Sequence, residues 1–146
     1  MRIGAHGLPC DVDTPEIAAG VVIFAHGSGS SRMSPRNRQV ARALNQAGLA
    51  TMLFDLLTVE EAEDRRNVFD IPLLAGRVGE AITAARENKD LQWLNIGLFG
   101  ASTGAAAALC AAAVEGAGIS AVVSRGGRPD LSSDALKRVV APTLLI

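Results

Sequence analysis

The chain has 146 residues, of which 49% are hydrophobic and 20% charged, and its formal net charge is −1. This length fits one domain with its own core, and the composition is that of a globular, soluble protein. The near-neutral charge argues against general nucleic-acid binding. The longest apolar run, residues 105–114, is too short to cross a bilayer, and the chain begins without the long apolar region of a signal peptide. With two cysteines, Cys10 and Cys110, we expect a reduced, cytoplasmic protein with no membrane partner.

Short apolar runs that end at turn residues predict strands buried on both faces of a parallel sheet. In chain order, these runs are residues 21–25, 50–54, 94–99, 119–123 and 143–146. The segment 2–12 is expected to add one or two edge strands.

Helix signals lie between the strands. Ser34 is a good N-cap, Pro35 suits the first helical position, and Gly48 stops this helix. Asp70 caps a second helix, and a third follows in the Ala-rich run. A fourth, shorter helix is expected over residues 133–139. The alternation predicts a single α/β domain, residues 1–146, with a mainly parallel sheet, right-handed crossovers and helices on both faces.

One long connection, residues 58–67, is rich in Glu, Asp and Arg. It follows a strand, so it lies at the carboxyl edge of the sheet, where α/β proteins place ligands. The charge run itself favours a solvated loop or short helix over a binding role.

The most informative motif is Gly100-Ala101-Ser102-Thr103-Gly104, which stands between a predicted strand and the Ala-rich helix. A strand, a sharp turn bearing Ser between small residues, and a helix are the context of a nucleophile elbow. The alternative is that Ser102 caps the helix while the glycines allow close packing of helix and sheet.

A serine hydroxyl becomes a good nucleophile when a base takes its proton and donors stabilise the oxyanion. One expected donor is the backbone N–H of Thr103, at the positive end of the following helix. The second is the backbone N–H of Ser28, in the small-residue loop after the strand 21–25. Phosphate binding by this loop ranks below the oxyanion role, because the loop lacks the G-K-[ST] ending of a P-loop.

The base is not evident. His6 and His26 both precede Ser102, whereas hydrolases with this elbow follow the order Ser, acid, His. We expect His26 to brace the oxyanion loop rather than to act as the base. The sequence has no C-x-x-C, no His cluster and no metal-ligand spacing, so neither a metal nor a cofactor is expected.

Together these motifs resemble the α/β-hydrolase superfamily, and more narrowly the dienelactone-hydrolase-like bacterial proteins with a serine nucleophile. The segments that carry the resemblance are residues 24–30, 34–38, 54–58, 69–71, 100–104 and 124–131. The resemblance implies hydrolysis of carboxylic esters, thioesters or lactones, with Ser102 as nucleophile and Ser28 and Thr103 as oxyanion donors. Dienelactone hydrolases proper use cysteine at the elbow, so lactone specificity does not transfer. Some similar proteins are fused to phosphoribosyltransferase domains.

The resemblance also implies a longer fold. Similar proteins continue past the strand at 143–146 into the loops that hold the acid and the histidine, and into a final strand and helix. We expect these parts to be missing here and the chain alone to be inactive or weakly active. Asp130, which follows the preceding strand, is the substitute acid. An unpaired edge at residues 143–146 favours dimerisation.

The interval 124–142 is too short for a cap domain, so an open site is expected. Arg125 and Arg128 lie at the carboxyl edge, where they either pair with an anionic substrate group or bond loop carbonyls. Two other functions stay open. One is a non-catalytic binding or assembly module on the same fold; the other is a nucleotide-binding domain, although G-x-G-x-x-G is absent.

Overall fold

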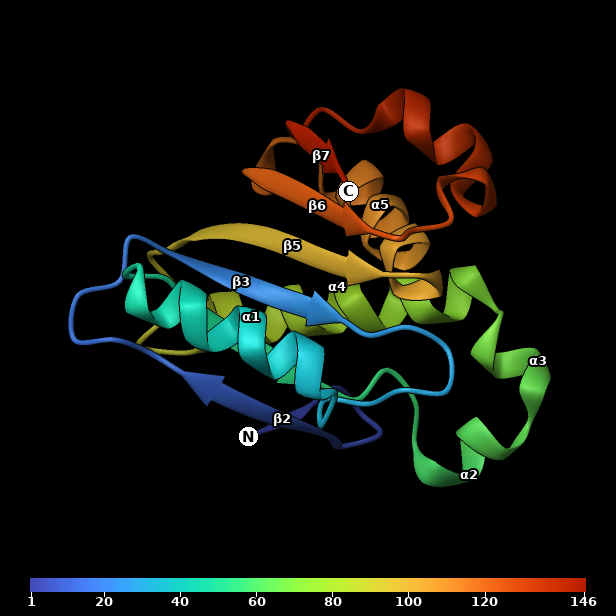
Figure 1. Ribbon diagram of the computed structural model, residues 1–146, viewed down its shortest axis with the longest axis horizontal. Coiled ribbons are helices and arrows are strands. Elements are labelled where there is room, and N and C mark those ends of the chain that lie inside the picture. Colours follow the sequence, from blue (N-terminus) through green and yellow to red (C-terminus); the bar gives the residue numbers. More distant parts are fainter.

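The computed structural model describes residues 1–146 apart from the side chain of Ala117, and a seven-stranded sheet runs through it (Figure 1). The spatial order is β1-β2-β4-β3-β5-β6-β7. Strands β4, β3, β5, β6 and β7 are parallel, whereas β1 and β2 form an antiparallel edge. The strands are β1 (Arg2–Ile3), β2 (Leu8–Asp13), β3 (Gly20–Ala25), β4 (Ala50–Phe54), β5 (Asn95–Ala101), β6 (Ala121–Arg125) and β7 (Thr143–Leu145). The predicted mainly parallel sheet and both expected edge strands are confirmed.

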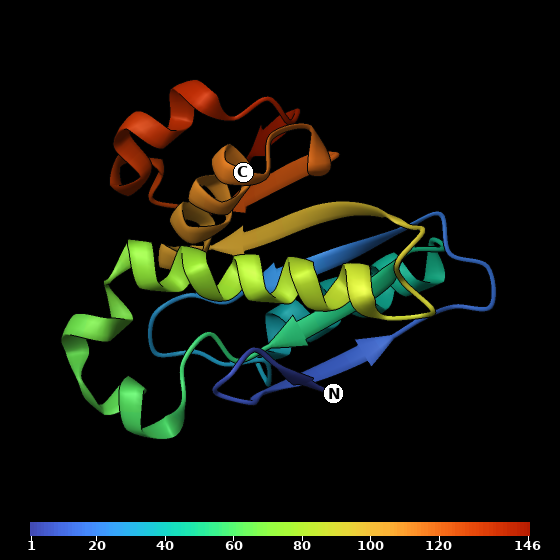
Figure 2. The same ribbon diagram turned by 180° about the vertical axis from the view of Figure 1, so that it is seen from behind.

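Helices cover the two faces of this sheet. Helix α1 (Pro35–Gln46) lies on one face, and α4 (Ile71–Glu87) and α5 (Thr103–Glu115) lie on the other, as the opposite views in Figures 1 and 2 show. The side chain of Ser34 accepts a hydrogen bond from the Asn37 N–H, and that of Asp70 accepts one from the Leu73 N–H. Both predicted N-caps are therefore confirmed.

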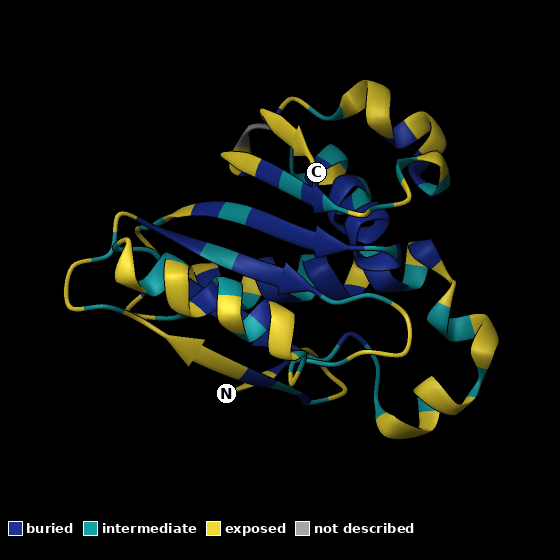
Figure 3. Cartoon of the chain, viewed as in Figure 1, coloured by how far each residue is buried: buried dark blue, intermediate teal, exposed yellow. Residues whose placement is uncertain are grey.

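The buried hydrophobic residues form two clusters of unequal size, and Figure 3 shows that the central strands β3 and β5 are mostly buried. Successive side chains of a strand point to opposite faces, so Ile23 joins the large cluster beneath α4 and α5 while Phe24 joins the small one beneath α1. In the small cluster the ring centroids of Phe24 and Phe99 lie 4.9 Å apart. Burial on both faces explains why the β3 sequence is continuously apolar.

The polar connection 58–67 folds into two short helices, α2 (Val59–Glu63) and α3 (Arg65–Val68), beyond the carboxyl ends of the strands (Figure 1). Thr58 and Glu61 form a capping box at the start of α2. Arg77 of α4 is 4% exposed and bonds the carboxylate of Glu61 at 2.8 Å and that of Glu80 at 3.2 Å. This buried guanidinium ties the outlying segment to the body of the domain.

The prediction of a helix over residues 133–139 is wrong both in the type of helix and in its boundaries. The chain instead forms a 3-10 element, η2 (Pro129–Arg138), which is broken at Ser133 by a φ of 37°. The Ser133 hydroxyl donates to the Asp130 carbonyl at 3.2 Å, a local bond that competes with regular helix. The Ser132 hydroxyl donates to the Ala106 carbonyl and fastens η2 to α5. A shorter 3-10 turn, η1 (Gly116–Gly118), follows α5.

The run at 143–146 forms the predicted strand, but the expectation that this strand is buried on both faces is wrong. All three residues of β7 are exposed, because β7 lies at the margin of the sheet. That this edge promotes a dimer stays a prediction. The segment between β6 and β7 holds η2 alone, so the described chain carries no cap domain there, as expected. Among the described helices, none is both long and apolar enough to cross a membrane.

Candidate active site

Ser102 occupies the sharp turn between β5 and α5 with φ 51° and ψ −122°. Positive φ is uncommon for a residue other than glycine and marks backbone strain that the surrounding structure has to hold. The side chain of Ser102 makes no capping hydrogen bond to the described helix. The predicted strained turn is therefore confirmed, the side-chain cap of the alternative is not formed, and the role of Ser102 as a nucleophile stays a prediction.

Small residues beside Ser102 are required by close packing. A Cβ atom on Gly104 would collide with the carbonyl oxygens of Ala25 and His26, and one on Gly100 would collide with the backbone of Ala105. A Cβ on Gly27 would lie 3.0 Å from the Cβ of Ser102. The elbow is thus pressed against the loop that follows β3.

The register of the sheet creates this contact. Ala25, the last residue of β3, pairs with Gly100 near the end of β5, so the loops after the two parallel strands leave the same edge side by side. A cavity of about 210 Å³ lies beside them, and both Ser28 and Thr103 line it. The structure thus brings the two predicted oxyanion donors to one cavity next to Ser102.

The donor atoms themselves suit an anion. Among the described residues, the backbone N–H of Ser28 donates to no protein acceptor, and Thr103 is the first residue of α5, whose leading N–H groups have no acceptor within the helix. The buried hydroxyl of Thr103 likewise has no partner among the described residues. A buried polar group such as this hydroxyl is costly until something bonds it, whereas Ser28 is exposed and its N–H is open to solvent.

His26 braces the loop, as expected. Its Nε2 accepts a hydrogen bond from the Leu56 N–H at 3.1 Å, so the proton of the neutral ring is on Nδ1, which donates to the Gly27 carbonyl at 3.0 Å. Burial lowers the pKa of His26 below its ordinary value and favours this neutral form. With both nitrogens occupied, His26 is not placed to take a proton from Ser102. His6 is exposed in the turn between β1 and β2.

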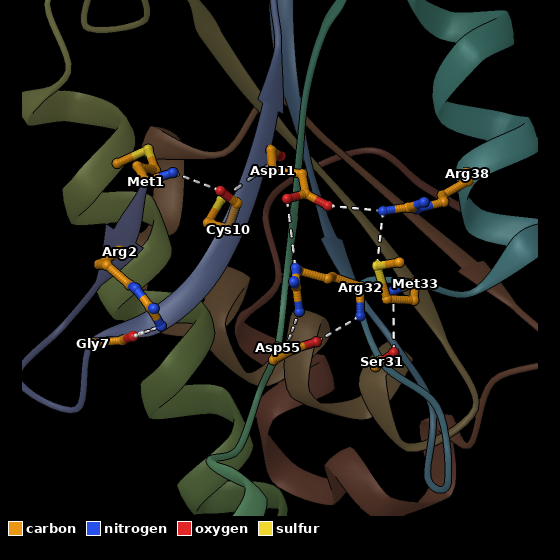
Figure 4. Close-up of polar contacts among 10 residues, drawn as sticks. All are labelled: Met1, Arg2, Gly7, Cys10, Asp11, Ser31, Arg32, Met33, Arg38 and Asp55. Atoms are coloured by element: carbon orange, nitrogen blue, oxygen red, sulfur yellow. Dashed lines mark hydrogen bonds and ion pairs between the residues drawn. The ribbon is translucent and has the colours of Figure 1, made fainter.

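A second anchor of the same loop was not predicted from the sequence (Figure 4). Asp55, just after β4, accepts from the backbone N–H of Arg32 at 2.7 Å and from its Nη1 at 2.6 Å. Arg32 also approaches Asp11 of β2 at 3.5 Å, and Asp11 bonds Arg38 of α1 at 3.0 Å. The position of Asp55 directly after a predicted strand was the one signal that could have singled it out.

The arginines expected near the site bind partners within the protein. Arg125 donates to the side-chain oxygen of Asn37 at 3.0 Å, and its guanidinium lies 5.5 Å from the centroid of the Phe99 ring. Arg128 pairs with Asp130 at 2.7 Å. The hydrogen bonds from Arg128 lower the pKa of Asp130 and favour its charged form. Asp130 is exposed, and its carboxylate bonds Arg128 rather than either histidine.

The cysteines offer no competing nucleophile. Cys10 is buried, and burial raises its pKa to about 12; burial also raises the pKa of Cys110. A thiol with a raised pKa holds little of the reactive thiolate. Among the described residues, no cluster of His, Cys, Asp and Glu is arranged to hold a metal ion.

Comparison with known proteins agrees with the fold described above. Residues 18–144 match the protein family described as "Alpha/beta hydrolase domain". The chain belongs to this family. A crystal structure of dienelactone hydrolase from Anabaena variabilis ATCC 29413 is 56% identical and superposes with a TM-score of 0.94, over 97% of this chain and 68% of that one.

Two further comparisons concern length and fold. Two Mycobacterium tuberculosis proteins whose names propose a phosphoribosyl transferase are 60% identical over 132 residues, which is 90% of this chain and 30% of theirs. The chain thus spans less than a third of the length of these curated relatives. An α/β serine hydrolase without lid from Xanthomonas campestris shares the fold, with a TM-score of 0.73 at 20% identity over 100% of this chain and 81% of that one.

Proposed function

We propose that this chain carries the nucleophile and the oxyanion hole of a serine hydrolase that acts on carboxylic esters, thioesters or lactones. The observation that carries the proposal is the strained backbone of Ser102 beside a cavity lined by Ser28 and Thr103. In the proposed reaction, the Ser102 hydroxyl gives its proton to the base and attacks the acyl carbon. The bond from the acyl carbon to the leaving alcohol or thiol breaks, this group takes the proton, and an acyl-enzyme remains. Water then releases the acid.

The two backbone N–H groups, of Ser28 and Thr103, would bond the oxygen that becomes negative during both steps. Donors that are already oriented and unpaired stabilise this charge without reorganisation, and one such donor is worth roughly 10²–10³ in rate. The bond from Arg32 to Asp55 and the bonds of His26 would keep the Ser28 loop in place.

The general base is proposed to come from outside the described residues. Both ring nitrogens of His26 already have hydrogen-bond partners, and His6 is exposed in the turn between β1 and β2. Asp130 stays a candidate for the acid. The phosphoribosyl transferase in the names of the Mycobacterium tuberculosis proteins would then belong to the part of those proteins that this chain does not match.

A covalent probe tests the proposal in the complete protein. A fluorophosphonate should label the wild type, and Ser102→Ala should abolish the labelling, because only an activated serine reacts quickly with this probe. Ser28→Ala is the matched control, since the proposed role of Ser28 uses its backbone N–H, and it should keep its labelling. Equal labelling of the wild type and Ser102→Ala would place the nucleophile elsewhere.

The competing function is a non-catalytic module on this fold. The hydrogen bonds of His26 favour it, because they leave neither ring nitrogen free to act as the base. Turnover of p-nitrophenyl acetate separates the two. A complete protein that neither turns over the ester nor labels at Ser102 would fit the non-catalytic module.

A further inference from the structure

We propose that the cavity beside Ser102 holds the acyl part of the substrate and selects an uncharged, apolar acyl group of short to medium length. The inference rests on the proposed function and names its substrate class. It comes from three properties of the cavity: its place, the chemistry of its walls and its size.

The place of the cavity links it to the reacting carbonyl. Its lining includes Ser28, Thr103, which directly follows Ser102, and Gly27, where a Cβ atom would lie 3.0 Å from the Cβ of Ser102; Ser102 itself is not among the lining residues. A carbonyl whose oxygen is bonded by Ser28 and Thr103 therefore has one of its two substituents directed along this wall. The acyl substituent stays attached to Ser102 after the alcohol has left, so it is the one that benefits from a bound position in both steps.

The walls are apolar and carry no free positive charge. The apolar part comes from Leu56, Leu57, Val59, Ala62, Val68 and Leu74. Among the described lining residues, Asp55 is the charged one, and Arg32 already binds both of its oxygens. The neutral His26 adds no charge. A carboxylate on the acyl group would lose water here without gaining a cation, whereas an alkyl or aryl group would lose only unfavourable contact with water.

The size sets an upper limit on the acyl group. The cavity measures about 210 Å³, and an apolar protein cavity of about 150 Å³ is enough for benzene. Butanoyl, hexanoyl and benzoyl groups therefore match its scale. The outer wall is the segment at α2, which Arg77 fastens to α4 through Glu61. While this pair holds α2 against α4, the wall restricts the acyl groups that fit inside the cavity.

Kinetics with p-nitrophenyl esters in the complete protein test the proposal. The acyl series runs from acetate through butanoate and hexanoate to decanoate, with the half ester of succinate as the charged member. Burial of each methylene should raise kcat/KM roughly threefold to fourfold until the cavity is full. We expect a decline at decanoate and at least a tenfold lower value for the succinate half ester than for butanoate. A parallel series of acetates with different alcohols should show no such rise.

Two neighbouring positions of α2 supply a matched pair of variants. Ala62 lines the cavity and Glu63 does not, and both are exposed, so substitution at either is structurally tolerated. Ala62→Phe should lower the ratio of kcat/KM for hexanoate to that for acetate at least tenfold, whereas Glu63→Phe should keep the wild-type ratio. Ala62→Lys should raise the relative rate of the succinate half ester, and Glu63→Lys should not.

The outcomes separate the two proposals. Absence of any Ser102-dependent turnover overturns the proposed function, and this inference with it. Turnover that depends on Ser102 but is indifferent to acyl length, prefers the succinate half ester, follows the alcohol instead, or changes equally in the Ala62 and Glu63 variants overturns the inference alone.

Discussion

Two turns that flank parallel strands use glycine for different reasons. In the turn from β5 to α5, a side chain on Gly104 would collide with the carbonyl oxygens of Ala25 and His26. In the turn from α1 to β4, Gly48 has a φ of 82°, and the nearest atom to a side chain there is 3.8 Å away. The first glycine is required by its neighbours and the second by its own backbone. Of these two turns, the one beside Ser102 is packed closely against a neighbouring backbone and the other is not.

The largest effect should come from Gly104→Ala. The added carbon would push apart the β3 and α5 backbones, and because backbone gives way less readily than a side chain, we expect a loss of about 3 kcal/mol of stability, near the upper end for overpacking. The displaced elbow should also cut the rate of fluorophosphonate labelling at Ser102 more than tenfold. Urea unfolding and labelling measure the two effects.

Gly76→Ala is the control for this substitution. Gly76 lies inside α4, and no neighbouring atom lies within 4 Å of the position that a Cβ atom would occupy there. Alanine should therefore stabilise the helix by about 0.5–1 kcal/mol. If Gly104→Ala unfolds and labels like the wild type, the close contact at the elbow is not a constraint on this protein.

A smaller effect is expected for Gly48→Ala. Alanine at a left-handed position costs about 1–2 kcal/mol, and open space around the residue adds nothing further. Labelling of Ser102 should stay at the wild-type rate, because the α1–β4 turn lies where β4 begins, whereas Ser102 lies where the parallel strand β5 ends. Gly48→Asn should be tolerated better, since Asn adopts this conformation more readily. A labelling defect in Gly48→Ala would remove the distinction between the two turns.

The smallest effect concerns pH at the loop beside the elbow. Burial lowers the pKa of His26, so the unfolded chain binds a proton more readily than the folded one. The contribution of the neutral ring is fully present above the unfolded histidine pKa of about 6.5 and is lost as the pH falls below it. His26→Asn should flatten this part of the stability curve, as urea unfolding between about pH 7.5 and pH 5 would show. Parallel curves for the two proteins would contradict the bracing role.

Much of the fold could be predicted because its signals are local. Continuous apolar runs identified the buried strands, Ser34 and Asp70 identified helix starts, and the glycines around Ser102 identified the elbow. Each of these depends on a few neighbouring residues, whose pattern is visible in the sequence.

The remainder depends on contacts between distant positions. Arg32 and Asp55 are 23 positions apart, and no spacing rule marks them as partners. In residues 58–67 the many charged side chains predicted a solvated segment. Nothing in the sequence indicated that Val59 and Ala62 of this segment line the cavity. The break at Ser133 depends on a hydroxyl that bonds its own backbone rather than continuing the helix.

The attachment of α2 and α3 also bears on how a ligand would reach the cavity. Neither of these described helices has a buried residue, so the segment is held by polar links such as the Arg77–Glu61 pair and the bond from Asn67 to the Glu61 carbonyl. A segment without buried residues is expected to open locally at a lower free energy than the sheet, so its amides should exchange with solvent earlier than those of β3 and β5. Local opening of this segment would have to break the Arg77–Glu61 pair, whereas the turn at Ser102 is held by packing against the loop after β3.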